Sequence, residues 1–280
     1  MINVNVKYFL LVLITLSLPL SAFAESGSFR TRVHQAELSA DTEEDVEAEI
    51  RFGKTISARI LGKFPVYENE KINQYVNLVG KSLASNSNRS DIEFRFAVLD
   101  VDFINAYSAP GGYIFITKGA ILAMQDEAEL ASVLAHEIAH ITEKHIVKEF
   151  KIKGKEKGAA AGVSRLLGSS NSSSQALFSQ AVDNAVNQLL NKGFKQKDEY
   201  DSDRIALLLL ANTGYDTSSL SRYLKRLMEK TSITNHQKHK PTHPPTNDRI
   251  KSLSTMSKLE NLDNLNFPRA RTRFEQYVKK

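Results

Sequence analysis

Residues 134–140 read Leu-Ala-His-Glu-Ile-Ala-His, and this stretch decides how the rest of the chain is interpreted. It lies in the most regularly periodic helix that the sequence predicts. Positions i and i+4 lie about 40° apart around a helix, so His136 and His140 share one face and can bind one cation together. Glu137 then lies beside the cation, where it can take a proton from water and pass it to a leaving amine, as peptide hydrolysis requires. The alternative is a pair of helix histidines beside a surface acid, which this rare five-residue pattern disfavours.

The pattern leaves the third metal ligand to be found. A catalytic zinc site takes three protein ligands and keeps one position for water. The chain has no cysteine, so thiolate ligands and a deformylase-type site are excluded. A metzincin would need Gly and His where this sequence has Glu143 and Ile146. On a helix that continues to Glu149, His145 would lie about 180° from His136, either solvated or behind the ligands. We therefore expect a carboxylate from another helix.

Residues 198–203 offer such a carboxylate in the sequence Asp-Glu-Tyr-Asp-Ser-Asp. They begin a predicted helix that becomes apolar on all sides over residues 205–211, so the helix should be deeply buried. Glu199 could bind the metal, and Asp203, four positions later on the same face, could accept a hydrogen bond from a ligand histidine. The alternative is that these acids only complement the helix N-terminus. The need for a third ligand favours the metal site.

Composition and charge limit the classes of function. The chain has 280 residues, with 37 Lys and Arg against 32 Asp and Glu and a formal charge of +5. Basic and acidic residues alternate along most of the chain, which disfavours nucleic acid as a partner. With 41% hydrophobic and 25% charged residues, the composition is that of an ordinary globular protein.

The N-terminus has the pattern of an export signal. Residues 1–24 combine one basic residue, an apolar run over residues 8–20 and the ending Ala22-Phe23-Ala24, as in a signal peptide cleaved after Ala24. An uncleaved anchor is the alternative, but the apolar run is shorter than the roughly 20 residues that span a bilayer. We expect a periplasmic protein with a flexible segment at 25–42 and no transmembrane segment in the mature chain. Peripheral membrane association stays open.

Periodicity predicts a helix-dominated α+β fold. The expected helices cover about 43–61, 72–79, 118–149, 177–189, 197–212 and 218–229, with a further helical segment at the C-terminus. Two strands are expected at 93–100 and 113–117, the second after a turn at Pro110-Gly111-Gly112 whose glycines admit a positive φ. The tract 168–174 and the segment 231–247 are predicted to be loops, and each could act as a lid.

Further motifs give the chain a resemblance to a known family. Residues 105–112 read Asn-Ala-Tyr-Ser-Ala-Pro-Gly-Gly, and His243-Pro244 is followed by Arg249-Ile250. Together with residues 134–140 and 199–203, these segments resemble the gluzincin metallopeptidases of the HtpX and CAAX-prenyl-protease type, in their soluble, exported bacterial branch. The resemblance extends over about residues 47–253. The only departure noted is Ser202, where the family usually has alanine, which exchanges one small residue for another.

The resemblance implies a zincin-like metallopeptidase fold, with a small β-sheet beside the helix of residues 134–140, in a single domain of residues 43–280. It also implies one Zn²⁺ per chain, bound by His136, His140 and Glu199. Glu137 would be the base, and Asp203 would orient a ligand. Two histidines and one glutamate would also accept other divalent ions.

The same resemblance suggests that His243 and Arg249 approach the active site. His243 would stabilise the oxyanion or occupy the open zinc position in a resting state, and a stiff surface loop is the alternative. Members of this branch often carry tetratricopeptide repeats after the catalytic domain, and we expect none in this sequence.

The expected function is a zinc endopeptidase that degrades unfolded or misassembled cell-envelope proteins. The strand at 113–117 would offer its edge to an extended substrate, which is read through its backbone. A chaperone-like or binding protein with a structural or silenced zinc site is the main alternative, because structural sites close all four positions. A zinc-dependent cell-wall amidase shares the metal chemistry and differs only in its groove.

Overall fold

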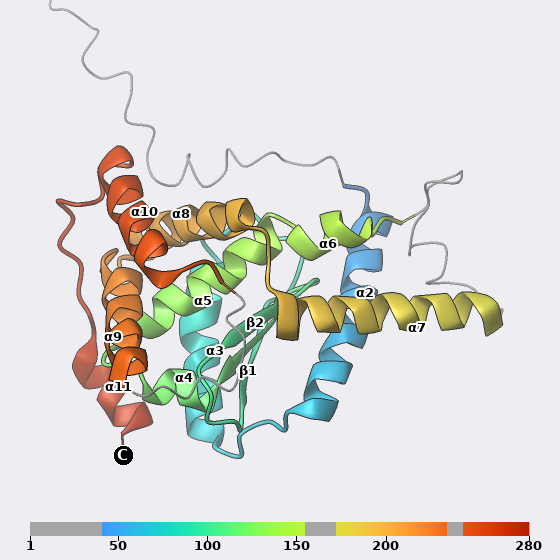
Figure 1. Ribbon diagram of the computed structural model, residues 1–280, viewed down its shortest axis with the longest axis horizontal. Helices are drawn as coiled ribbons and strands as arrows, with labels where there is room; N and C mark the ends of the chain where they lie inside the picture. Colours follow the sequence, from blue (N-terminus) through green and yellow to red (C-terminus); the bar gives the residue numbers. More distant parts are fainter. Residues whose placement is uncertain (1–40, 155–171, 234–242, 280) are drawn as a thin grey trace, which may run out of the picture.

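The computed structural model describes residues 41–154, 172–233 and 243–279. The predicted signal peptide, the flexible segment up to residue 40 and part of each predicted loop lie outside these residues. The described chain is dominated by helices around one three-stranded sheet (Figure 1). The predicted α+β class is thereby confirmed.

The helices and strands follow one another in a simple order. The first part of the chain forms α2 (Glu43–Lys63), α3 (Glu70–Ala84), β1 (Arg95–Leu99), β2 (Ala106–Ala109), β3 (Tyr113–Thr117) and α4 (Lys118–Leu122). The second part forms α5 (Glu127–Thr142), α6 (His145–Phe150), α7 (Ser172–Asn187), the π-helix η2 (Gln188–Lys192), α8 (Gln196–Thr213), α9 (Ser219–Ile233), α10 (Thr246–Leu259) and α11 (Arg271–Val278).

Local sequence signals explain where several helices begin. Thr42 caps α2 through a reciprocal capping box with Asp45, at the predicted start of that helix. Asn69 caps α3, and Asp126 caps α5 by accepting from the backbone N–H of Glu129. Two loop predictions were partly wrong, because residues 172–174 begin α7 and residues 231–233 end α9.

The sheet has the order β1-β3-β2, with β1 parallel and β2 antiparallel to β3. The strand β2 was not predicted, because it has four residues and all of them are buried, so it shows no alternation of apolar and polar positions. Its presence corrects the expected substrate edge. Both edges of β3 are paired, so among the described strands the edge beside the helix of residues 134–140 belongs to β2.

Helices cover both faces of the sheet. Alternate residues such as Phe96, Val98 and Ile116 face the larger hydrophobic cluster with α3 and α5, while Tyr107 and Phe115 face a second cluster with α2 and α7. Gly111 and Gly112 form the turn between β2 and β3 with φ of 72° and 91°, as predicted. A side chain at Gly111 would collide with the backbone of α2, so the turn fixes β2 against that helix.

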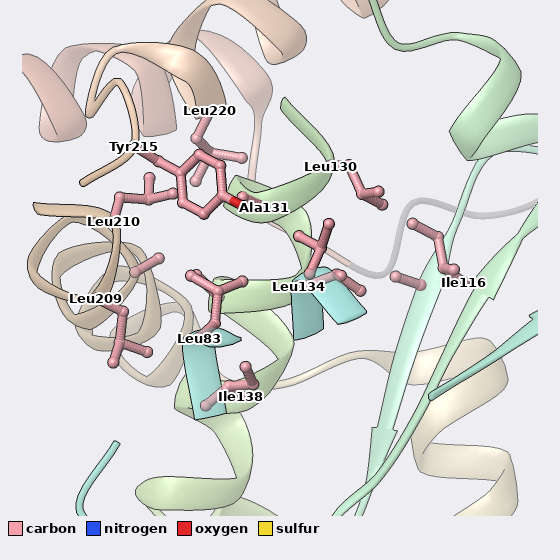
Figure 2. Packing of buried hydrophobic residues seen from close by; sticks show 14 of the residues in the cluster. Leu83, Ile116, Leu130, Ala131, Leu134, Ile138, Leu209, Leu210, Tyr215 and Leu220 are labelled. Atoms are coloured by element: carbon pink, nitrogen blue, oxygen red, sulfur yellow. The ribbon is translucent and has the colours of Figure 1, made fainter. Parts of the chain in front are cut away.

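The helix α5 lies at the centre of the fold. Fourteen of its 16 residues are buried, so it has no solvent face, and its main neighbour is α8. Figure 2 shows Leu134 and Ile138 of α5 among side chains of α3, α8 and the sheet, including Leu209. Each fully buried leucine or isoleucine contributes about 1.5–3 kcal/mol. This packing holds α5 and α8 in a fixed register, one beside the other.

The end of α5 differs from the prediction. The expected helix continued to Glu149, but α5 ends at Thr142, and Lys144 adopts a left-handed conformation with φ of 56°. Arg89 donates a hydrogen bond to the carbonyl of Ile141, which satisfies an acceptor at the helix end. The break turns the chain so that α6 buries Ile146 in the second hydrophobic cluster.

Among the described residues, no helix combines the length and the apolar character needed to cross a membrane.

Candidate metal centre

The helices α5 and α8 bring together the three predicted ligand side chains. Nε2 of His136 lies 3.1 Å from Nε2 of His140 and 3.5 Å from Oε2 of Glu199. Nε2 of His140 lies 3.7 Å from Oε1 of Glu199. All three side chains are nearly or completely buried. Two adjacent turns of one helix and the first turn of another therefore aim three donor atoms at one point.

These donors suit a tetrahedral zinc ion. Ligands about 2.0–2.1 Å from a tetrahedral zinc lie roughly 3.3 Å from one another, close to the separations found here. Oε1 of Glu199 is fully buried and has no hydrogen-bond partner in the described chain. A buried carboxylate oxygen without a partner is unfavourable unless a cation meets it. The chemistry and the spacing of the donor set both fit zinc.

Asp203 and Arg249 surround the outer side of His136. Oδ1 of Asp203 lies 2.9 Å from Nδ1 of His136, so the ring donates from Nδ1 and keeps Nε2 for a metal. Arg249 donates to both oxygens of Asp203, at 2.9 and 2.6 Å. All three side chains are buried. The arrangement places Asp203 where it can orient the ring of His136, and it places Arg249 behind Asp203.

The electrostatics of this side are dominated by paired charges. Burial and the Arg249 charge act to lower the pKa of His136, but the hydrogen bonds to Asp203 and Glu199 outweigh them and raise it to about 9. Burial acts to raise the pKa of Asp203, but the charge and hydrogen bonds of Arg249 outweigh it and lower it to about 2. The pKa of Glu199 is lowered in the same way by His243, His136 and His140, against the effect of burial.

Glu137 faces a cavity beside the edge strand. The cavity opens to solvent and lies between β2 and the residues that follow α7. Its lining comprises Ala106, Tyr107, Ser108, Glu137, Leu189, Gly193, Phe194 and His243. Burial raises the pKa of Glu137, and the nearby charges of His136 and His243 act against that rise. The predicted base is thus buried next to the strand edge.

His243 lies at the open side of the three donors. It precedes α10, and its Nδ1 donates to Oε2 of Glu199 at 2.5 Å. Its ring lies 5.5 Å from that of His136, centroid to centroid. His136, Glu199 and His243 each offer a ligand atom within 4.8 Å of the others. The segment just before α10 and the first turn of α10 therefore place His243 and Arg249 near the three donors.

His140 has a different surrounding. Its Nδ1 lies 2.8 Å from Nδ1 of His145, and its ring stacks on Phe194 with centroids 4.0 Å apart. Burial lowers the pKa of His145 to about 4 and that of His140 well below its usual range. Of the two positions expected for His145, the structure shows the one behind a predicted ligand. The continuous helix assumed for it was wrong, because the chain breaks at Lys144.

No sequence pattern indicated that Phe194 lies at the site. It follows η2 and Gly193, which has φ of 73°. A π-helix of five residues is rare and often occurs at functional sites, but its sequence here, Gln-Leu-Leu-Asn-Lys, resembles that of an ordinary helix. Only Gly193 could have signalled a turn toward the site.

The chain is similar in sequence to several known proteases. The chain is 27% identical to the putative beta-barrel assembly-enhancing protease of Vibrio cholerae over 212 residues, which are 73% of this chain and 43% of that protein. It is 24% identical to the beta-barrel assembly-enhancing protease of Escherichia coli K12 over 252 residues, 88% of this chain and 50% of that protein. The mitochondrial metalloendopeptidase OMA1 of Arabidopsis thaliana is 26% identical over 184 residues, 64% of this chain and 35% of that protein.

The chain spans about half the length of the beta-barrel assembly-enhancing proteases that it matches. The sequence pattern of one peptidase family covers residues 70–257, from the start of α3 to the end part of α10. This range includes α5, α8 and the start of α10, and therefore all of the side chains that surround the three donors. The family resemblance noted from the motifs is confirmed, and the chain belongs to peptidase family M48, a family of metalloendopeptidases.

Proposed function

We propose that this chain is a zinc-dependent endopeptidase in which His136, His140 and Glu199 bind one Zn²⁺ and Glu137 is the general base. The observation that carries the proposal is the convergence of three buried side chains, one of which has a carboxylate oxygen without a hydrogen-bond partner among the described residues. Glu137 lies beside these donors and lines the cavity next to β2. Membership of family M48 supports the same reaction class.

Each side chain has a distinct task in this proposal. Zinc, when bound, supplies a Lewis acid that polarises the scissile carbonyl and makes water acidic near neutral pH. Glu137 takes a proton from the attacking water and delivers it to the leaving amine. Asp203 holds His136 in the tautomer that leaves Nε2 free, and Arg249 holds Asp203. His243, on the open side, donates a hydrogen bond to the developing oxyanion once it leaves Glu199.

The proposed substrate is an extended polypeptide. The edge of β2 borders the cavity that Glu137 faces, so a peptide added to that edge would present its backbone to the base. Recognition through the backbone favours unfolded or misassembled proteins over folded ones. Two relatives are named for enhancing β-barrel assembly, which supports a role in quality control of the cell envelope. The pattern of residues 1–24 supports export to the periplasm.

We further infer that residues 43–280 form one domain. Helix α11 lies against α3 and α5, and Phe274 is completely buried. Glu127 at the start of α5 accepts hydrogen bonds from Tyr75 and Tyr215 at 2.7 Å and from Arg273 of α11. A buried carboxylate with three donors from distant segments ties the end of the described chain to the helix that carries the histidines.

The decisive test is removal of the base. Glu137→Gln should keep zinc and the fold but reduce hydrolysis of a casein-like substrate by at least 10²-fold, the lower end of what general base catalysis supplies. Glu143→Gln makes the same chemical change just after α5, at a side chain that does not line the cavity beside Glu137, and should retain activity. A chelator should abolish the wild-type activity. Equal cleavage by wild type and Glu137→Gln would show that the assigned base is wrong.

A second candidate is a protein whose zinc is silenced or structural. It is favoured by His243, whose ligand atom lies with those of His136 and Glu199. Replacing His243 by alanine distinguishes three roles: closing the open zinc position, stabilising the oxyanion, and completing a structural site. Raised proteolysis would indicate that His243 closes the open position, whereas lower kcat with zinc retained would indicate oxyanion stabilisation. Loss of both zinc and fold would favour the structural site.

A further inference from the structure

The contact between His140 and His145 restricts where each ring carries its proton. Two ring nitrogens 2.8 Å apart form a hydrogen bond only when one is protonated and the other is not. Nε2 of His140 is the atom that lies near His136 and Glu199, at 3.1 and 3.7 Å, so it is the atom that would meet a metal. A metal-binding Nε2 must be unprotonated.

The proton of a neutral His140 must then lie on Nδ1. Nδ1 donates, and Nδ1 of His145 accepts. A neutral His145 that accepts at Nδ1 carries its own proton on Nε2, which lies 3.9 Å from Oδ1 of Asp198. The nearby carboxylate favours a proton at that position. The opposite assignment would place the proton of His140 on Nε2 and block the ligand atom.

We infer that His145 is a positioning residue that fixes the tautomer and ring orientation of His140 by accepting a hydrogen bond from its Nδ1. This inference rests on the proposed zinc site and adds to it the outer partner of the second ligand. His145 is 9% exposed, so water does not offer an easy substitute for the acceptor. The break at Lys144 is what brings the ring into place.

Packing by Phe194 alone does not explain the arrangement. The ring of Phe194 stacks on His140 and also contacts His145, with centroids 5.6 Å apart. An aromatic ring restricts the plane of His140, but it offers no acceptor to Nδ1. Phe194 and His145 therefore make separable contributions, one by contact and one by hydrogen bonding.

Three variants distinguish these contributions. In His145→Asn the amide oxygen takes the place of Nδ1, whereas His145→Leu fills a similar volume without an acceptor. Phe194→Leu removes the stacked ring and leaves the acceptor in place. The zinc dissociation constant of each variant is measured by competition with a chromophoric chelator, and the metal-free fold is checked by circular dichroism.

We expect His145→Leu to weaken zinc binding by about 10- to 100-fold, the usual effect of losing the hydrogen-bond partner of a ligand histidine. His145→Asn should stay within about threefold of wild type. The inference is overturned if His145→Leu binds zinc as tightly as wild type, or if His145→Asn is as weak as His145→Leu. A weakening confined to Phe194→Leu would assign the orientation of His140 to packing instead.

A spectroscopic measurement keeps the inference testable if a variant does not fold. In metal-free wild type with ¹⁵N-labelled histidine, His140 should carry its proton on Nδ1 and His145 on Nε2, as read from the ring nitrogen shifts and their couplings to carbon-bound protons. A proton on Nε2 of His140 would overturn the inference. This readout does not require zinc, whereas failure of the wild type to bind zinc would overturn the proposed function.

Discussion

His136 and His140 lie one turn apart on α5, yet their surroundings differ in kind. His136 is held by a buried chain of charges, in which Asp203 accepts from its ring and Arg249 donates twice to Asp203. His140 is held by a second imidazole, that of His145, and by the ring of Phe194. One predicted ligand thus has an ionic support and the other a neutral, largely aromatic support.

The difference follows from how each support is assembled. The partners of His136 come from α8 and α10, so they reach it only after distant parts of the chain have packed. His145 lies five residues from His140 and arrives through a local break in the helix. A charged outer partner also raises the basicity of its ligand more than a neutral one does. We therefore expect the partners of His136 to set the charge of the site. The partners of His140 should set the orientation of its ring.

The largest effect should come from breaking the ionic support. Asp203→Ala leaves the Arg249 guanidinium buried without its carboxylate partner, which should destabilise the metal-free protein by about 3–5 kcal/mol. Urea unfolding of wild type and variant measures this. The double variant Asp203→Ala with Arg249→Met removes the unpaired charge and should recover much of the loss. If the double variant is less stable than Asp203→Ala, the charge is not the cause.

The next largest effect should be on how the free energy of unfolding depends on pH. The contributions of His136 and His140 to this dependence have opposite signs. His136 has its pKa raised to about 9 in the fold, so its contribution to stability is complete below about pH 6.5 and is lost as the pH rises to 9. His140 has its pKa lowered, so stability is lost instead as the pH falls below about 6.5 and the unfolded chain takes up the proton. The alkaline loss should be on the order of 3 kcal/mol.

Urea unfolding of the metal-free protein from pH 5 to 10 tests both signs. His136→Gln should flatten the alkaline side of the profile, and His140→Gln should flatten the side below pH 6.5. A wild-type profile without an alkaline decline would contradict the charged environment assigned to His136.

The smallest effect should come from the aromatic support. Phe194→Leu removes a stacked ring but leaves an apolar side chain of similar reach, so we expect a loss of about 0.5–1.5 kcal/mol in the free energy of unfolding. Thermal and urea unfolding of the metal-free variant provide the measurement. A loss as large as that of Asp203→Ala would mean that the two supports do not differ as described.

The same contrast explains what could be predicted from the sequence. The pair His136 and His140 follows from helical spacing, and Glu199 with Asp203 follows from the same rule on a second helix. That these two pairs of residues lie side by side depends on the packing of α5 against α8. The spacing of residues within each helix does not specify this packing. Arg249 and His243 were singled out only through the family resemblance, because nothing local ties them to α5.

Two features had no usable local signal. The strand β2 is short and buried throughout, so it lacks the alternation that indicates a strand. The helix break before His145 occurs at Lys144, a residue that seldom adopts a left-handed conformation, and no glycine or proline lies there. Tertiary packing decided both, through pairing with β3 and burial of Ile146.

The central claim is that two histidines and one glutamate from separate helices bind one zinc ion. Zinc titration of the metal-free protein tests it directly, with Glu199→Ala compared with Glu143→Ala as the control. We predict one tightly bound zinc per chain in wild type and in the control, and at least a hundredfold weaker binding in Glu199→Ala. Tight, stoichiometric binding by Glu199→Ala would contradict the claim.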